Sequence, residues 1–332
     1  MKYPVNLMRG VLALALLAIV ACSPQSADYS ITFGGDIILT RAGDPLYKSI
    51  EGTTNSWGVL EKPQKVFKNS MKMPDYFFAN LESPLGAASE PLIKNSDDLN
   101  LCSAADQSGV LTKGHLTLVS LVNNHRNDCQ INGIEETRRI LEQNQILFVG
   151  LDLIPAYIET SNGKIAIIAA EDVTIPIDVD SLVSHVKRAR QIAQVVIVSV
   201  HWGNEYQTGP DSRQQEIAQQ LADAGADVIW GHHPHVLQKM EWLNAASGKK
   251  TLVFYSLGNL IADQWMLDDA QRTAVVRISF HNSKIVKIQV IPLFMDFSTR
   301  RLKSVNDSMI KNQIFQRLKL DTLENRGVVI DY

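Results

Sequence analysis

The chain has 332 residues, the length of one large domain or of two modest ones. Hydrophobic residues make up 45% and charged residues 20%, a balance typical of a globular protein that buries a core. The formal net charge is −3 and the sequence holds no dense basic cluster, which argues against a nucleic-acid partner.

The first 22 residues have the pattern of an export signal rather than of a folded element. Lys2 and Arg9 supply positive charge, and an uninterrupted apolar run follows from Val11 to Val20. This run is about half as long as a membrane-spanning helix needs to be. We therefore predict a signal peptide over residues 1–22.

The end of this segment, Ile19-Val20-Ala21-Cys22, resembles a bacterial lipobox, in which small residues precede a cysteine that is lipidated and becomes the new N-terminus. We predict lipidation of Cys22, a tether over residues 23–29 and the membrane as a partner. An ordinary signal peptide cleaved near Ala21 is the alternative. Ser23 follows the cysteine where Asp could stand, so in a Gram-negative bacterium we expect an exported protein anchored to the periplasmic side of the outer membrane.

Six short apolar strands follow along the chain, and each ends in a polar cluster. The clusters are Gly34-Gly35-Asp36, Asn80-Leu81-Glu82, Asn123-Asn124-His125, His201-Trp202-Gly203, Gly231-His232-His233-Pro234-His235 and Gly258-Asn259. Alternating strands and helices predict an α/β layered fold, in which functional groups gather beyond the carboxyl ends of the strands.

Helical periodicity occupies two of the stretches between these strands. One helix is predicted from Ile134 to Gln143, and another begins after a cap at Asp211 or Ser212 and stops at Gly225. Cys102 and Cys129 lie outside both. In an oxidising exported compartment they can form one disulfide, and two separate buried thiols are the alternative that the sequence leaves open.

Towards the C-terminus the apolar pattern changes to that of a β-hairpin, with strands over 273–280 and 285–291. From about Asn306 the apolar residues Ile310, Ile314 and Leu318 have helical spacing. We predict a domain over residues 30–300 and a helical extension over 301–332 that packs on it.

The polar clusters contain the side chains that metal ions prefer. Neutral imidazoles combined with carboxylates are typical ligands of Zn, Mn and Fe. If the backbone of 231–235 is extended, His233 and His235 share one side, and His232 faces the other way or sits over the pocket mouth. Gly34 and Gly35 permit a sharp turn that would leave Asp36 pointing out over the sheet.

Other polar residues have weaker claims. Glu205 and Tyr206 line the pocket or anchor a loop, and the Glu171-Asp172 pair ends a strand that can approach the site. Arg41 and Arg213 can attract an anionic substrate, although solvated arginines are the common alternative.

In this order the clusters resemble the motifs of the CapA family of bacterial poly-γ-glutamate and capsule synthesis proteins. The similarity extends from about Ser30 to Ile261 and includes Asp128, Gly133 and the run Ala224-Gly225-Ala226-Asp227. The resemblance implies a calcineurin-like metallophosphoesterase fold, a four-layer αββα sandwich of two sheets between helices.

The resemblance also implies roles, carried over by position. His125 would protonate a leaving oxygen, with Asp128 as the second catalytic residue. The implied metal ligands are Asp36, Glu82, Asn124, His201, His233 and His235, although His232 could be counted instead in the final pair. The implied substrate pocket contains Asn80, Asn123, His232, Glu205 and Asn259.

One position departs from the phosphoesterase pattern. Those enzymes read Asp-x-His on the first strand, and here Ile37 and Ile38 follow Asp36. One metal position therefore lacks a ligand, and we expect one tightly held ion with a second held weakly, or no productive site. The CapA family shares this departure.

A divalent ion, whether Mn, Zn or Fe, would polarise a phosphoryl or carbonyl oxygen and lower the pKa of bound water, while His125 acts as general acid. Three functions remain open. The first is a lipoprotein acting in poly-γ-glutamate or capsular polymer biosynthesis or export, with a polymer synthetase or export complex as partner. The others are a periplasmic phosphoesterase and a non-catalytic polymer-binding lipoprotein. The expected substrate is an anionic polymer or a phosphoester.

Overall fold

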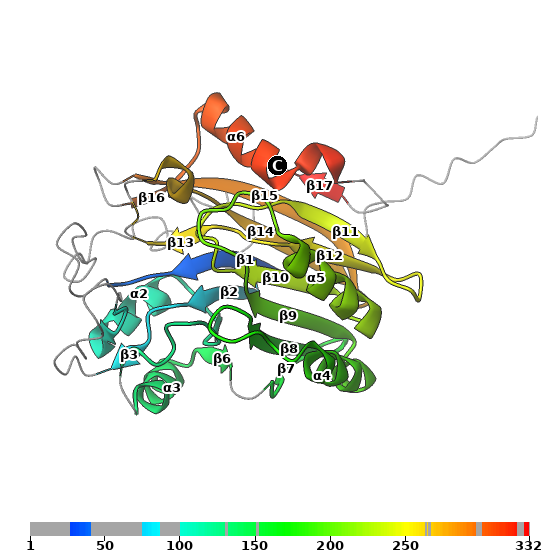
Figure 1. Cartoon of the computed structure of the whole chain (residues 1–332), viewed down its shortest axis with the longest axis horizontal. Helices are drawn as coiled ribbons and strands as arrows, with labels where there is room; N and C mark the ends of the chain where they lie inside the picture. Colours follow the sequence, from blue (N-terminus) through cyan, green and yellow to red (C-terminus); the bar gives the residue numbers. More distant parts are fainter. Residues whose placement is uncertain are drawn as a thin grey trace, which may run out of the picture.

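A computed structural model describes residues 27–40, 75–86, 100–129, 132–150, 153–262, 264, 267–296, 301–323 and 329–331. The predicted signal peptide, Cys22 and Arg41 lie outside these ranges. Two β-sheets pack face to face, and helices cover their outer faces (Figure 1). This arrangement confirms the predicted αββα sandwich.

The first sheet has nine strands and combines parallel and antiparallel pairing. Its parallel part carries the first polar clusters of the sequence, and the predicted hairpin forms as β14 and β15. In spatial order the strands are β16 (Arg301–Ser304), β15 (Lys284–Asp296), β14 (Arg272–His281), β1 (Tyr29–Ile37), β2 (Tyr76–Leu81), β5 (Leu118–Ser120) and β6 (Leu147–Val149), with β13 (Asn259–Ile261) beside β1 and β17 (Val329–Asp331) beside β15.

The second sheet has six strands, of which the central four are parallel and the two edge strands antiparallel. In spatial order they are β11 (Met240–Asn244), β12 (Lys250–Phe254), β10 (Val228–His232), β9 (Val195–His201), β8 (Gly163–Glu171) and β7 (Ala156–Thr160). A small separate sheet pairs β3 (Leu85–Gly86) with β4 (Ser103–Ala104).

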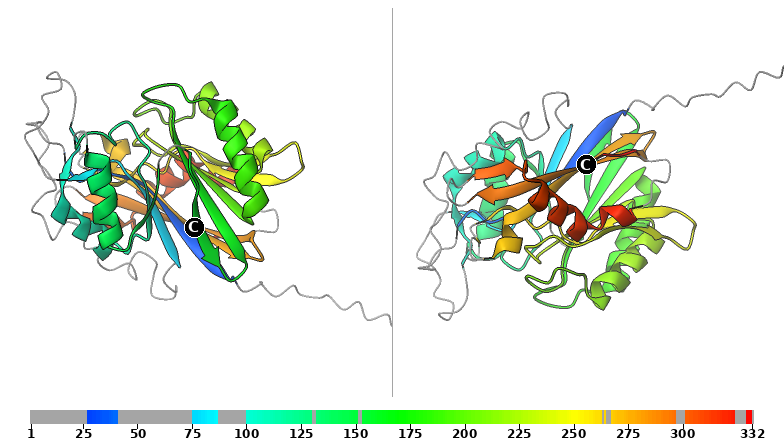
Figure 2. Two further views of the ribbon diagram at one scale, coloured as in Figure 1. Left: turned by 90° about the horizontal axis from the view of Figure 1, so that it is seen from below. Right: turned by 90° about the horizontal axis from the view of Figure 1, so that it is seen from above.

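The helices form the two outer layers. α4 (Val179–Ile192) and α5 (Ser212–Ala224) cover the second sheet, while α2 (Ser108–Lys113) and α3 (Gly133–Gln143) cover the first (Figures 1 and 2). Asp211 caps α5 through a capping box with Gln214, and Gly225 ends the helix in the left-handed conformation, as predicted. None of the helices in the described ranges has the length and apolar composition to cross a bilayer.

The parallel strands are buried on both faces, which explains why they read as continuous apolar runs. Phe33 and Phe78 point between the sheets, where their rings lie 5.4 and 6.3 Å from that of Trp230. Phe77 and Ala79, the neighbours of Phe78, point outward into the cluster that α2 and α3 cover. This core fixes the sheets relative to each other and so fixes the distances between their carboxyl ends.

Two local predictions need correction. β1 does not turn at Gly34-Gly35 but continues through Asp36 to Ile37. Gly35 is needed for close packing, because a Cβ atom there would lie 1.8 Å from the Gly258 carbonyl oxygen. The C-terminal segment is not purely helical: α6 (Ser308–Leu318) is present, but β16 and β17 extend the first sheet. Strands of four and three residues are too short to show a period in sequence.

Candidate metal centre

Side chains from both sheets meet where the carboxyl ends of β1, β2, β9 and β10 approach one another. Glu82, His233 and His235 are buried, and their potential ligand atoms all lie within 4.8 Å of one another. Glu82 follows β2 of the first sheet and the histidines follow β10 of the second, so the fold joins residues that are about 150 positions apart.

Glu82 lies at the middle of this cluster. Its Oε1 is 3.5 Å from His201 Nε2 and 3.8 Å from His235 Nε2, and His201 Nε2 is 2.8 Å from Asn124 Oδ1. Ligand atoms bound at about 2.1 Å to one ion lie roughly 3.0–3.4 Å apart. The distances from Glu82 to His201 and His235 are slightly longer than this, and the residues whose ligand atoms all lie close enough to share one ion after a small adjustment are Glu82, His233 and His235.

Glu82 is fully buried, yet neither of its carboxylate oxygens has a hydrogen-bond partner among the described residues. Buried polar atoms are nearly always hydrogen-bonded, because an unpaired one loses its hydration without compensation. A cation between Glu82 and the surrounding imidazoles would supply the missing partner. The donor set thus fits a divalent ion.

Asp36 organises the other side of the centre. Its Oδ1 accepts a hydrogen bond of 2.8 Å from Asn80 Nδ2, and its Oδ2 accepts one of 3.1 Å from the His233 backbone N–H. His232 Nδ1 lies 3.5 Å from Oδ1, and His235 Nδ1 lies 3.4 Å from Oδ2. One carboxylate therefore contacts all three histidines at the end of β10 and just after it.

The backbone through this cluster is not extended, so the condition under which His233 and His235 were expected to share one side is not met. His233 and His235 have φ angles of 93° and 57°, values that cost a non-glycine residue about 1–3 kcal/mol each. The turn places both rings beside Glu82. His232 is only 1% exposed and its Nε2 lies 3.1 Å from Ser199 Oγ, so its expected place at the pocket mouth is wrong.

Burial and neighbouring charges shift the pKa values of the carboxylates and imidazoles in the centre. Burial raises the pKa of Glu82 to about 7. Burial alone would lower the pKa of His235, but the carboxylates of Glu82 and Asp36 raise it to about 9. Burial, with repulsion from neighbouring histidines, lowers the pKa of His201 well below its usual value and that of His233 to about 4. His201 and His233 are therefore neutral and available as ligands.

His125 and Asp128 form a pair beside this cluster. His125 Nδ1 lies 2.8 Å from Asp128 Oδ2, and the same oxygen accepts a hydrogen bond of 2.7 Å from the Leu101 backbone N–H. Asp128 is 2% exposed, whereas the imidazole is partly open to solvent. This carboxylate favours the tautomer of His125 that carries its proton on Nδ1.

Cys102 and Cys129 are joined by a disulfide, which decides between the two alternatives left open by the sequence. Cys102 directly follows Leu101 and Cys129 directly follows Asp128. The disulfide therefore joins the two segments that are also linked by the hydrogen bond from Leu101 to Asp128. By fixing Asp128, it also fixes the orientation of His125.

Three asparagines predicted to line the substrate pocket have a supporting position instead. Asn80, Asn123 and Asn259 are at most 3% exposed. Asn123 donates to the Leu81 carbonyl at 2.9 Å, while Asn259 Oδ1 accepts from His235 Nδ1 at 3.0 Å. Asn80 and Asn259 therefore orient the metal-ligand candidates Asp36 and His235, and Asn123 supports Asn80. No sequence pattern pointed to Gln264, whose Oε1 fixes the Asn259 amide at 2.7 Å.

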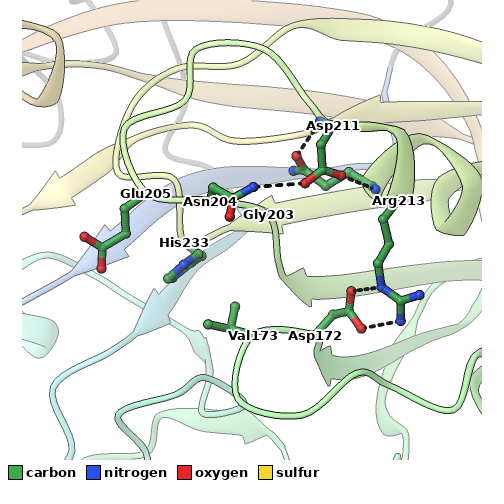
Figure 3. Close-up of a pocket in the computed structure, with 9 residues that line it drawn as sticks. Asp172, Val173, Gly203, Asn204, Glu205, Asp211, Arg213 and His233 are labelled. Atoms are coloured by element: carbon green, nitrogen blue, oxygen red, sulfur yellow. Dashed lines mark hydrogen bonds and ion pairs between the residues drawn. The ribbon is translucent and has the colours of Figure 1, made fainter.

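A pocket of about 310 Å³ opens beside the centre, with His233 in its wall. Figure 3 shows His233 between Glu205 and the ion pair of Asp172 with Arg213. Glu205 lines this pocket as predicted. Arg213 is not an isolated solvated residue, because its Nε and Nη2 each lie 2.6 Å from an Asp172 oxygen.

Residues 30–264 match the family model described as bacterial capsule synthesis protein PGA_cap. The chain belongs to this family. Two curated relatives are the capsule biosynthesis protein CapA of Bacillus anthracis and the PGA biosynthesis protein CapA of Bacillus subtilis (strain 168). They are 26% and 28% identical to the chain over 326 and 318 residues, covering 90% and 88% of the chain and 74% and 78% of the relatives.

Among solved structures, a hypothetical protein from Thermus thermophilus aligns with 79% of this chain and 98% of its own at a TM-score of 0.49 and 13% identity.

Every residue of the candidate metal centre, from Asp36 to Asn259, lies within the PGA_cap match, as does Gln264. The predicted resemblance to the CapA family is therefore confirmed.

Proposed function

We propose that this PGA_cap protein is an exported lipoprotein that acts in the biosynthesis or export of a capsular polymer such as poly-γ-glutamate through a metal-dependent hydrolytic centre. The family and the names of the Bacillus relatives support the polymer. The observation that carries the metal centre is the pair of Glu82 oxygens, buried and without hydrogen-bond partners among the described residues.

The candidate ligands lie around Glu82. His201 lies next to Glu82 and Asn124, His235 lies next to Glu82 and Asp36, and His233 belongs to the close group of Glu82 and His235. An ion held there supplies a Lewis acid that polarises a phosphoryl or carbonyl oxygen and activates water. The imidazoles and the carboxylate suit Mn, Zn or Fe.

His232 can replace the ligand that the first strand lacks. Its Nδ1 is buried, has no hydrogen bond among the described residues and lies 3.5 Å from Asp36 Oδ1. An imidazole from β10 therefore stands next to the aspartate, where phosphoesterases use a histidine of the first strand. We infer that His232 completes the Asp36 side of the centre.

The neighbouring residues have the arrangement that hydrolysis needs. His125 can donate a proton from Nε2 to a leaving oxygen or nitrogen, and Asp128 stabilises the protonated imidazole at Nδ1. The pocket beside His233 holds the part of the substrate that does not react. This preorganised proton donor favours a catalytic protein over a non-catalytic binding module.

Two assays with the same variants test this function. We expect purified protein to hydrolyse a chromogenic phosphodiester with Mn²⁺, and cells lacking the gene to lose surface polymer. Glu82→Ala should fail in both, while Glu216→Gln on the exposed face of α5 should pass in both. Hydrolysis without any effect on polymer would favour a periplasmic phosphoesterase with another substrate. Polymer restored by Glu82→Ala would contradict a metal-dependent role.

Membrane anchoring is a separate part of the proposal. We expect the mature chain to sediment with membranes and to partition into detergent, and Cys22→Ser to prevent acylation. A mature wild-type chain cut near Ala21 and free of lipid would support the ordinary signal peptide instead. Mass spectrometry of the mature N-terminus distinguishes the two.

A further inference from the structure

A second cleft, of about 560 Å³, lies at the ends of the strands opposite to the metal centre. Its walls include Gln194 just before β9, Asp227 just before β10 and Lys250 at the start of β12. The metal centre stands at the carboxyl ends of the same sheet. β9 has seven residues, so about 23 Å separate the two ends.

The rim of this cleft is positively charged. Arg190, Lys249, Lys250 and Lys284 line it, and Asp227 is the carboxylate among its lining residues. Asp227 is shared by Arg190 Nη1 at 2.5 Å and Lys249 Nζ at 2.7 Å. Lys250 contacts the neutral Asn244 Oδ1, and Lys284 is exposed at the β14–β15 turn. Four basic side chains against two carboxylates, Asp227 and Asp28, which accepts from the Asn282 backbone at the same rim, leave the rim with a net charge of +2.

The floor of the cleft is apolar. Trp242 and Ile285 line it and pack against the core between the two sheets. The Trp242 indole N–H is buried and has no hydrogen-bond partner among the described residues. A cluster of basic side chains on one face is what the negative surface of an anionic bilayer attracts.

The start of the folded domain lies at this same rim. Asp28 accepts a hydrogen bond of 2.7 Å from the Asn282 backbone N–H and lies 3.1 Å from His281 Nδ1. In both views of Figure 2 the start of β1 (blue) lies beside the turn between β14 and β15 (orange). Cys22 precedes Asp28 by six residues, a span of at most about 20 Å.

We propose that this face docks on an anionic phospholipid surface, with Lys250 and Lys284 against the headgroups and the metal centre facing away from the bilayer. A lipid on Cys22 would hold the rim within reach of the membrane, and the charge of the rim would orient the domain on it. The orientation rests on the proposed anchoring of Cys22, whereas the affinity of the face for anionic lipid does not.

Vesicle cosedimentation of the chain that starts at Ser23 tests the docking face without the anchor. This chain retains every element of the described fold, since the first begins at Tyr29. We expect it to bind vesicles in which phosphatidylglycerol replaces about a third of the phosphatidylcholine, to ignore pure phosphatidylcholine, and to dissociate as salt is raised. Lys250→Gln with Lys284→Gln should weaken binding about 30-fold, since each lysine near the surface contributes about fivefold.

The matched control is Lys113→Gln with Arg139→Gln, which removes the same charge from α2 and α3 over the first sheet. It should bind as the unchanged chain does. Equal weakening by both pairs, or equal binding to both kinds of vesicle, would overturn the docking face. The docking face would also be overturned if the chain bound soluble poly-glutamate through Lys250 and Lys284 but bound no vesicles. The cleft would then be a polymer site. Failure of lipidation would leave the vesicle result unchanged, because this chain lacks Cys22.

Discussion

The two halves of the candidate centre differ in how completely their buried carboxylates are hydrogen-bonded. Asp128 accepts from Leu101 and from His125, and a disulfide joins the segments that supply these contacts. Glu82 is equally buried, but its oxygens have no hydrogen-bond partner among the described residues. The first half is preorganised by the protein's own hydrogen bonds, whereas a cation, as proposed above, would compensate the second half for its lost hydration.

The largest effect should come from removing the half that needs the ion. We expect Glu82→Ala to abolish metal-dependent hydrolysis, a loss of at least about 10⁴-fold, because the ion provides several kcal/mol of transition-state stabilisation. His201→Ala should lose metal-dependent hydrolysis to a similar extent. Steady-state kinetics with metal analysis of the same samples measures this, and retained activity without bound metal would contradict it.

A smaller effect should come from the preorganised half. We expect His125→Ala and Asp128→Asn to lower kcat about 10²- to 10⁴-fold while the bound metal remains, because only proton donation is lost. The loss should be smaller for substrates with good leaving groups, such as nitrophenolate, than for alkyl esters. An equal loss for both kinds of substrate would show that His125 is not the acid.

The disulfide should affect stability more than metal binding. Cys102 and Cys129 are 27 residues apart, so Cys102→Ser with Cys129→Ser should lower the free energy of unfolding by about 3–4 kcal/mol. Urea denaturation with and without reductant measures this. We also expect kcat to fall without a change in metal content, because the disulfide holds the segment of Asp128, which positions His125. A fall in metal content with no separate effect on kcat would mean that the disulfide supports the residues around Glu82 rather than the His125–Asp128 pair.

The smallest effect should come from a residue in neither half. Asp178 caps α4 through a hydrogen bond from the Ser181 backbone N–H and lies outside the pocket beside His233. We expect Asp178→Ala to lower the free energy of unfolding by about 1 kcal/mol and to leave kcat unchanged. A large loss of activity would mean that the cap of α4 also positions the centre.

The sequence predicted the features that depend on local pattern. The ends of the strands, the cap and stop of α5 and the β14–β15 hairpin follow from periodicity and from capping residues, and the motif order predicted the sandwich. Because the carboxyl ends of parallel strands lie together, the sequence also predicted that Glu82 and His235 would meet.

The features that depend on distant contacts were missed. β1 runs past Gly35 because Gly258 packs against it, and His232 is buried because it contacts Ser199 and Trp230. Asn123 and Asn259 are buried because their side-chain amides form hydrogen bonds with buried groups of other segments, the Leu81 carbonyl and the His235 imidazole. No local pattern encodes such pairings, so only the assembled fold reveals them.

Metal analysis of the purified chain after incubation with Mn²⁺ or Zn²⁺ and gel filtration tests the metal centre most directly. We predict that the wild-type chain retains at least one equivalent of divalent ion, and that Glu82→Ala and His235→Ala retain far less at unchanged fold. A wild-type chain that keeps no ion under either condition would contradict the metal centre, because the buried Glu82 oxygens, which have no hydrogen bond among the described residues, would then not be explained by a cation.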